Sequence, residues 1–171
     1  MNELVSVLTL LVENSVIANF EYWSEFLLRI QRDEANRHPA LQEMFGSIRI
    51  PSLFCIRLRG IWRIGQHSEW VRAVESFPLK GVSPVSLEAP MQAALLVTKL
   101  GKEISTVKVG ENGDLTLNIS DGSSMFIQGT GGGWDESWFL ELPVDDPDRD
   151  KWQIVCESQG IIGGRIPASR N

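Results

Sequence analysis

The sequence has few of the residues on which most catalytic and metal sites depend. It contains two histidines, two cysteines and one tyrosine in 171 residues. Zinc sites draw on several histidine and cysteine ligands at short spacings. The two cysteines, Cys55 and Cys156, form no CxxC pair, and each lies in an apolar, strand-like run. This context predicts two small buried side chains rather than a disulfide. We therefore expect neither a metal nor a cofactor.

Local motifs that carry chemistry are also missing or incomplete. The run GTGGGW at 129–134 has no Lys-Ser/Thr pair and opens no helix, so it does not predict a phosphate-binding loop. The GxSxG motif of serine hydrolases is absent. Acids from Asp146 to Glu157 have the spacing of a calcium loop, but Lys151 stands where that loop needs glycine. These absences favour a protein without enzymatic activity. A deep pocket that gathers His67 with carboxylates would instead favour an enzyme or a small-ligand binder.

A signal peptide and a membrane span are not indicated. The apolar run at 4–12 follows Glu3 rather than basic residues, and it is too short to cross a bilayer. Its leucines and valines recur at three- and four-residue spacing, which predicts a helix over 3–13. We expect this helix to be buried, and we expect a cytoplasmic protein with no membrane partner.

What the sequence does contain is the pattern of an α+β domain. Apolar residues make up 43% of the chain and charged residues 22%, which fits one globular domain over 1–171. Periodicity predicts two main helices packed on the sheet, at 3–13 and 84–100. Alternating apolar residues from 103 onward, separated by turns at 111–114 and 121–122, predict an antiparallel β-meander of about five strands.

Two segments of the chain have similar sequence patterns. Those beginning at residues 8 and 94 both read as helix, strand, hairpin turn and strand. Aligning them matches Ile17 with Ile104 and matches the triplet Phe26, Leu28, Ile30 with Leu115, Leu117, Ile119. One interpretation is two related α-β-β halves, 1–80 and 84–171, which share one sheet or pack two sheets together. The other is that both segments follow the common pattern of α-β-β units.

Charge is distributed unevenly along the chain. The net charge is −6, and residues 135–157 alone hold eight acids against two bases. Residues 49–80 hold six bases against two acids. One interpretation is a solvated surface whose opposite charges attract each other across the fold. The other is an acidic surface that steers a basic protein partner, with tryptophans as anchors. The residues predicted to bind that partner are Trp134, Asp135, Glu136, Trp138, Asp145, Asp146, Asp148 and Asp150.

Nucleic acid is a poorer fit as a partner. Arg57, Arg59 and Arg63 stand near Trp62, a combination that can contact phosphates and stack on bases. The net negative charge of the whole chain would nevertheless repel a polyanion.

The C-terminal part resembles a kind of small bacterial α+β domain. The resemblance covers about residues 94–166, and the segments that carry it are LGKEISTVKVGENGDLTLNISDGSSMFIQG, DESWFLELP and WQIVCESQGIIGGRIP. Some similar domains resemble immunity proteins, which neutralise a toxin delivered by neighbouring bacteria. The resemblance therefore implies an immunity-type inhibitor, in which the acidic surface would cover a basic toxin. Two alternatives stay open: a small-ligand-binding protein or enzyme, and a homo-oligomeric module that pairs the exposed edge of the meander.

Overall fold

The computed structural model describes residues 3–33, 38–76, 84–131 and 133–168. The boundary between the two predicted halves, residues 81–83, lies outside this range. The described helices are α1 (Glu3–Val12), α2 (Pro39–Phe45), α3 (His67–Glu75) and α4 (Pro84–Val97). The described strands are β1 (Ser15–Tyr22), β2 (Phe26–Gln31), β3 (Leu53–Leu58), β4 (Trp62–Ile64), β5 (Glu103–Val109), β6 (Leu115–Ile119), β7 (Ser124–Ile127), β8 (Glu136–Glu141), β9 (Gln153–Glu157) and β10 (Ile162–Arg165).

The fold is α+β and dominated by its sheet. Ten strands form one sheet in the order β10-β9-β8-β3-β2-β1-β5-β6-β7-β4, and the pairs between them are antiparallel. The predicted C-terminal meander is wrong in one respect, because β8 does not continue beside β7. It pairs with β3, where Trp138 lies opposite Leu58 and Leu140 opposite Ile56. These four apolar side chains are buried in the same hydrophobic core.

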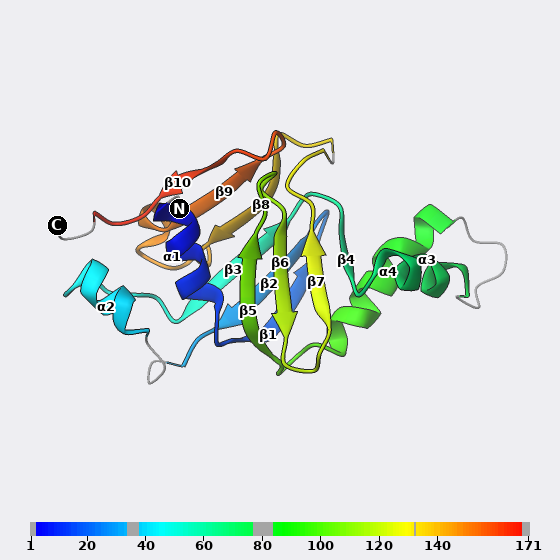
Figure 1. The fold of residues 1–171 in the computed structure, drawn as a ribbon, viewed down its shortest axis with the longest axis horizontal. Coiled ribbons are helices and arrows are strands. Elements are labelled where there is room, and N and C mark those ends of the chain that lie inside the picture. Colours follow the sequence, from blue (N-terminus) through cyan, green and yellow to red (C-terminus); the bar gives the residue numbers. More distant parts are fainter. Residues whose placement is uncertain (1–2, 34–37, 77–83, 132, 169–171) are drawn as a thin grey trace.

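The sheet is folded over on itself. β3 and β4 are six strand spacings apart in the order, roughly 29 Å in a flat sheet. The link from Leu58 to Trp62 spans at most about 14 Å. A flat sheet is therefore impossible, and Figure 1 shows β5–β7 lying in front of β1–β3. The short link between β3 and β4 continues both pairings: Arg59 N–H donates to Ser137 O of β8 at 3.0 Å, and Ile61 O accepts from Gln128 N–H, next to β7, at 2.8 Å.

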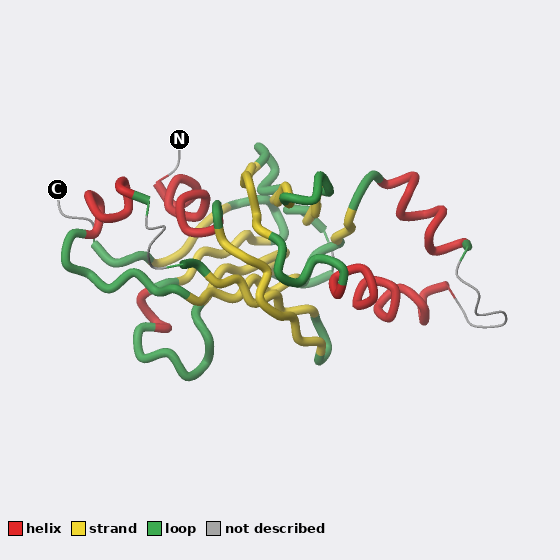
Figure 2. The backbone as a smooth tube through the Cα atoms, turned by 90° about the horizontal axis from the view of Figure 1, so that it is seen from below, coloured by secondary structure: helices red, strands yellow, loops and turns green. Residues whose placement is uncertain are grey.

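One hydrophobic core fills the space between the two layers. On β2, every second residue faces inward, so Phe26, Leu28 and Ile30 are buried while the residues between them are partly exposed. Strand alternation of this kind puts one face of each strand in the core. α1 adds its own apolar face, consisting of Val7, Leu8, Leu11 and Val12. Figures 1 and 2 both show α1 and α2 at one end of the molecule, with α3 and α4 at the other.

The two helices expected from periodicity, at 3–13 and 84–100, correspond to α1 and α4. Both are followed by a residue with positive φ, Asn14 at 60° and Gly101 at 75°. This left-handed conformation is common where a helix ends. Among the described residues, no helix is both long and apolar enough to cross a membrane.

Candidate functional site

The structure divides the predicted partner-binding residues between two places. Asp135 and Glu136 lie at the start of β8, whereas residues 145–150 follow its end. A strand of six residues is roughly 20 Å long, so the acids do not form one continuous cluster. Each end of the strand has to be considered by itself.

At the far end, two of the four aspartates are paired with the basic region. Arg49 Nη1 lies 3.2 Å from Asp146 Oδ1 and 3.2 Å from Asp148 Oδ2. Lys151 Nζ lies 2.7 Å from Asp148 Oδ1. Hydrogen bonds from Lys151 and Arg49 hold the pKa of Asp148 below its ordinary value. Asp145 and Asp150 are exposed. Attraction between opposite charges across the fold therefore accounts for much of this end.

Trp138 is not available to a partner. Its side chain is fully buried, with 0% of its surface exposed, and its Nε1–H donates to Gly113 O at 2.8 Å. The reason is strand alternation, because Trp138 and Leu140 share the inward face of β8. The expectation that Trp138 anchors a partner is corrected accordingly: it is a core residue.

Trp134, in contrast, is exposed and held in place from beneath. It is 51% exposed, and the Arg59 guanidinium lies 5.3 Å from the centre of its ring. Arg59 is fixed in turn, because its Nε donates to Glu25 at 2.7 Å and its Nη1 to Glu136 at 2.9 Å. A guanidinium over an indole face is a favourable cation–π contact. Trp134 is therefore an exposed aromatic side chain with a defined contact to Arg59.

The support beneath Trp134 is a charge-balanced network on the outer face of the sheet. Arg57 donates to Glu25 at 2.6 Å and, through Nε, to Glu141 at 2.9 Å, and Arg149 lies 3.4 Å from Glu141. With Arg59 and Glu136, the network contains three arginines and three glutamates. Burial by itself would raise the pKa of Glu25, but hydrogen bonds from Arg57 and Arg59 outweigh it, and that pKa is lowered. Glu25 is therefore ionised at neutral pH.

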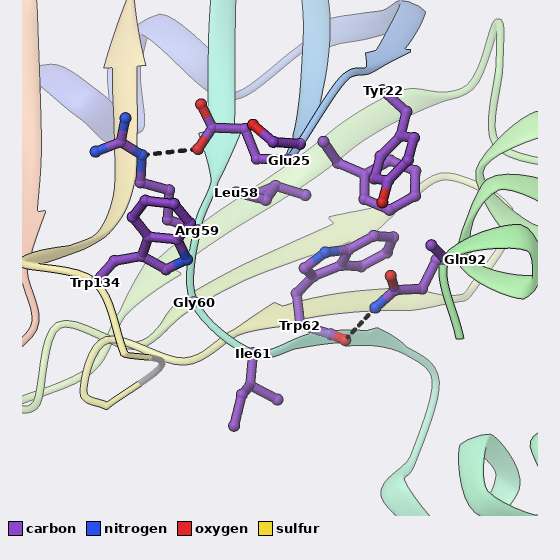
Figure 3. Close-up of a pocket in the computed structure, with 12 residues that line it drawn as sticks. Tyr22, Glu25, Leu58, Arg59, Gly60, Ile61, Trp62, Gln92 and Trp134 are labelled. Carbon is purple, nitrogen blue, oxygen red and sulfur yellow. Dashed lines mark hydrogen bonds and ion pairs between the residues drawn. The ribbon is translucent and has the colours of Figure 1, made fainter. Parts of the chain in front are cut away.

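A cavity of about 280 Å³ opens beside Trp134, at the end of the β1–β2 hairpin. Figure 3 shows Tyr22, Trp62 and Trp134 around its opening, with Glu25 and Arg59 along one side. Three apolar residues on its rim are largely exposed, Tyr22 at 53%, Ile61 at 57% and Trp134 at 51%. We call this cavity the aromatic cleft and define it by the lining residues Tyr22, Glu25, Phe26, Leu58, Arg59, Ile61, Trp62, Gln92 and Trp134.

The base of the aromatic cleft is a packed aromatic pair. Trp62 is buried and makes an edge-on contact with Phe26, with 5.0 Å between ring centres. Gln92 of α4 donates from Nε2 to Trp62 O at 3.5 Å (Figure 3). Edge-to-face aromatic pairs add stability beyond the area that they bury. The cleft is therefore already formed in the protein by itself.

A second hollow lies on the other side of the Trp134–Glu136 segment. It has a volume of about 450 Å³ and is lined by Asp135, Glu136 and Glu157, with Arg165 as its one base. We call it the acidic groove. Asp135 and Glu157 are exposed, and neither has an ion-pair partner among the described residues. Carboxylates without a counter-ion attract positive charge from a distance.

Sequence reasoning identified Trp134, Asp135 and Glu136 but missed the residues that complete the site. Arg59 is 75 positions from Trp134 in sequence, and no local pattern joins the two. Tyr22 and Ile61 had a weak signal, since each stands next to a turn that interrupts strand alternation. Among the described side chains, which do not include that of His67, no group of three or more histidine, cysteine, aspartate or glutamate residues could hold a metal ion. Comparison of the chain with protein-family models, curated proteins and solved structures found no match.

Proposed function

We propose that this protein is a non-enzymatic protein-binding module that captures a basic partner. In this proposal it resembles a bacterial immunity protein that acts in the cytoplasm, and its partner is a toxin. The partner would bind across the Trp134 surface, which we define as Trp134, Asp135, Glu157 and the cleft rim residues Tyr22 and Ile61. The observation that carries the proposal is the exposed Trp134, held by Arg59, between an aromatic cleft and an acidic groove.

The physical basis is a preorganised anchor beside uncompensated charge. Tryptophan is enriched among the residues that dominate binding energy at protein interfaces. An anchor that is already ordered loses less conformational entropy when a partner docks. Exposed carboxylates at Asp135 and Glu157 would accelerate encounter with a basic surface and repel an acidic one. Toxic nucleases bind a polyanion and so present basic surfaces of this kind.

The polar groups in the aromatic cleft favour binding over catalysis. A general base works best when its pKa lies near the operating pH. Glu25 has a lowered pKa and its carboxylate accepts hydrogen bonds from two arginines, so it is a weak base. This weighs against an enzyme that would use this cavity.

The test compares two charge reversals of equal size. Asp135→Lys/Glu157→Lys alters the Trp134 surface, whereas Asp145→Lys/Asp150→Lys alters exposed aspartates at the far end of β8. Each purified variant and the parent protein serve as bait in a lysate of the native host at low salt. We expect a basic protein that the parent and the second variant retain in equal amounts and that the first variant loses. Equal retention by all three baits, or retention of no basic protein by the parent, would contradict the proposal.

We further propose that residues 1–80 and 84–171 are two related α-β-β halves within this module. The register of their hairpins supports this. In β1–β2, Ile17 pairs with Ile30, and the register shifts before Asn19. In β5–β6, Ile104 pairs with Ile119, and the register shifts before Thr106. From there the paired residues of the two hairpins match one for one as far as the turn. The last matching pairs are Tyr22 with Phe26 and Val109 with Leu115.

A further inference from the structure

Two tryptophans hold corresponding positions in the proposed halves. Trp62 of β4 lies opposite Ile127 of β7, and Trp138 of β8 lies opposite Leu58 of β3. β7 follows and pairs with β6, while β3 pairs with β2. The sheet order β8-β3-β2-β1-β5-β6-β7-β4 therefore reads the same from both ends once β1 is matched with β5. Each half places its fourth strand beside the third strand of the other.

Backbone hydrogen bonds at matching positions of the two proposed halves are also equivalent. Asn14 N–H donates to Ile104 O at 2.8 Å, and Gly101 N–H donates to Ile17 O at 2.9 Å. Ile17 and Ile104 are the pair that the sequence alignment matches. The bonds from Arg59 N–H to Ser137 O and from Gln128 N–H to Ile61 O correspond in the same way. The surroundings of Trp62 can therefore be compared directly with those of Trp138.

Around Trp138, the position is closed by the β9–β10 hairpin. Cys156 of β9 lies directly opposite Trp138 and is fully buried, with 0% of its surface exposed. The turn after β9 packs on the β5–β6 turn so tightly that a Cβ added to Gly113 would overlap Cys156 Sγ and approach Gly160 O to 2.9 Å. The Trp138 indole is fully buried, and Trp138 lines neither the aromatic cleft nor the acidic groove.

Around Trp62, no strand takes the place of β9. β4 is the last of the described strands in the order, and β7 is its pairing partner. Instead, Gln92 of α4 donates to the Trp62 carbonyl (Figure 3), and Trp70 of α3 lies beside the Trp62 ring with 6.4 Å between ring centres. Helices α3 and α4 cover part of Trp62, and the aromatic cleft remains beside it, where the other half has Cys156 and its strand.

The charges around the cleft indicate what can fill it. Glu25 and Arg59 face it as a mutual ion pair, within a network of equal numbers of carboxylates and guanidinium groups. A buried charge needs a partner, and this network offers no surplus charge of either sign. The rings of Tyr22, Trp62 and Trp134 offer apolar contact instead. The volume of about 280 Å³ is large enough for one apolar side chain.

We infer that the aromatic cleft takes one uncharged aliphatic or aromatic side chain, presented by an extended segment of the basic partner, in the place that Cys156 holds over Trp138. This inference rests on the proposed function and on the two related halves. It adds a requirement to the charge argument: the partner segment carries an uncharged, apolar residue beside its basic residues.

The experiment uses single amino-acid amides as probes, so no partner is needed. N-acetyl-leucinamide and N-acetyl-phenylalaninamide are titrated into the ¹⁵N-labelled full-length protein, with N-acetyl-lysinamide and N-acetyl-aspartic acid α-amide as charged controls. Each of the six tryptophans carries one indole N–H that reports on its own surroundings. We expect saturable shifts at Trp62 and Trp134 with the two apolar amides, and none at Trp152, which is buried in the core against Phe45 and Phe54. Equal or stronger shifts with either charged amide, or shifts spread over all six indoles, would overturn the inference.

Matched variants decide whether the shifts come from the cleft. Ile61→Ala and Tyr22→Ala each remove part of the rim, while Val144→Ala shortens an apolar side chain that is 76% exposed and lies outside the cleft. We expect the dissociation constant for the apolar amides to rise roughly fourfold or more in the first two and to stay unchanged in Val144→Ala. An unchanged constant in both rim variants would overturn the inference. Because the amides report on the cleft alone, this failure is distinguishable from loss of partner capture by the charge reversals.

Discussion

At the scale of single residues, the account depends on Arg59. This side chain lies against the faces of Trp134 and Phe139, at 5.3 and 5.0 Å, while it donates to two glutamates. It is a base within a surface that is proposed to attract a basic partner. Its contribution is therefore structural: it positions Trp134 and neutralises Glu25 and Glu136.

This role makes a prediction that opposes simple electrostatics. Arg59→Gln removes a positive charge, which would strengthen the attraction of a basic partner if charge alone mattered. We expect weaker binding instead, because Trp134 loses its support and two carboxylates lose their partner. Arg59→Lys, which keeps the charge but not the planar fork, should weaken binding to a similar extent. Titration calorimetry with the captured partner measures both, and tighter binding by Arg59→Gln would refute the positioning role.

The cysteines give a second test at this scale. Burial raises the pKa of Cys55 and of Cys156 to about 11 in each case. At pH 8, about one thiol in a thousand is then ionised, and the thiolate is the reactive form. We expect iodoacetamide to label neither cysteine in the native protein at pH 8 and both in 6 M guanidinium chloride, as read by mass spectrometry. Rapid labelling of either residue in the native state would show that its surroundings are not those described.

At the scale of elements, the link from β7 to β8 packs closely against the β5–β6 turn at a glycine. A Cβ added to Gly129, in the link from β7 to β8, would overlap the backbone of Asn112 and Gly113 in the β5–β6 turn. Gly163 of β10 has no atom within 4 Å of the same position. Neither glycine has a φ in the left-handed region, so the two differ in close approach and not in backbone strain.

We therefore expect Gly129→Ala and Gly163→Ala to differ sharply. Overpacking against backbone costs about 1–3 kcal/mol or more, so Gly129→Ala should lower the free energy of unfolding by at least about 2 kcal/mol. Gly163→Ala should change it by less than about 0.5 kcal/mol, as is usual for unobstructed surface sites. Urea unfolding followed by tryptophan fluorescence measures both. Similar values for the two variants would contradict the close approach of the turns.

The elements also show how far the sequence predicts the fold. Both main helices and the β5–β6 hairpin at 103–119 were predictable, because periodicity and the Asn112-Gly113 turn are local signals. The place of β8 beside β3 was not predictable, since a strand carries no mark of which non-local neighbour it pairs with. The same limit applies to the site. Trp134 and Trp138 stand four residues apart in one acidic run, yet one is exposed and the other is core.

At the scale of the whole molecule, carboxylates with lowered pKa values tie stability to pH. Hydrogen bonds from arginines lower the pKa of Glu25, and Lys99 with Ser123 lowers that of Asp121. The unfolded chain then binds more protons than the folded one as the pH falls past about 4. The stabilisation by these groups is complete at neutral pH and is lost as the pH falls through their folded-state pKa values.

We expect the urea midpoint to be constant between pH 6 and 8 and to fall progressively below about pH 4.5. Glu25→Gln should lower the midpoint at pH 7 and reduce its dependence on pH, because the variant has no proton to gain at that position. Circular dichroism in urea at pH 3, 4, 5 and 7 gives the comparison. A midpoint for the parent protein that rises on acidification would contradict the charge network.

The central claim, that a basic partner binds at the Trp134 surface, is tested most directly by the affinity of Trp134→Ala for the captured partner. Its matched control is Val144→Ala, another truncation of a largely exposed apolar side chain, at the far end of β8. Anchor tryptophans at interfaces contribute about 2 kcal/mol or more, so we expect the dissociation constant of Trp134→Ala to rise by about thirtyfold or more and that of Val144→Ala to stay unchanged. Equal affinity of Trp134→Ala and the parent protein would contradict the account.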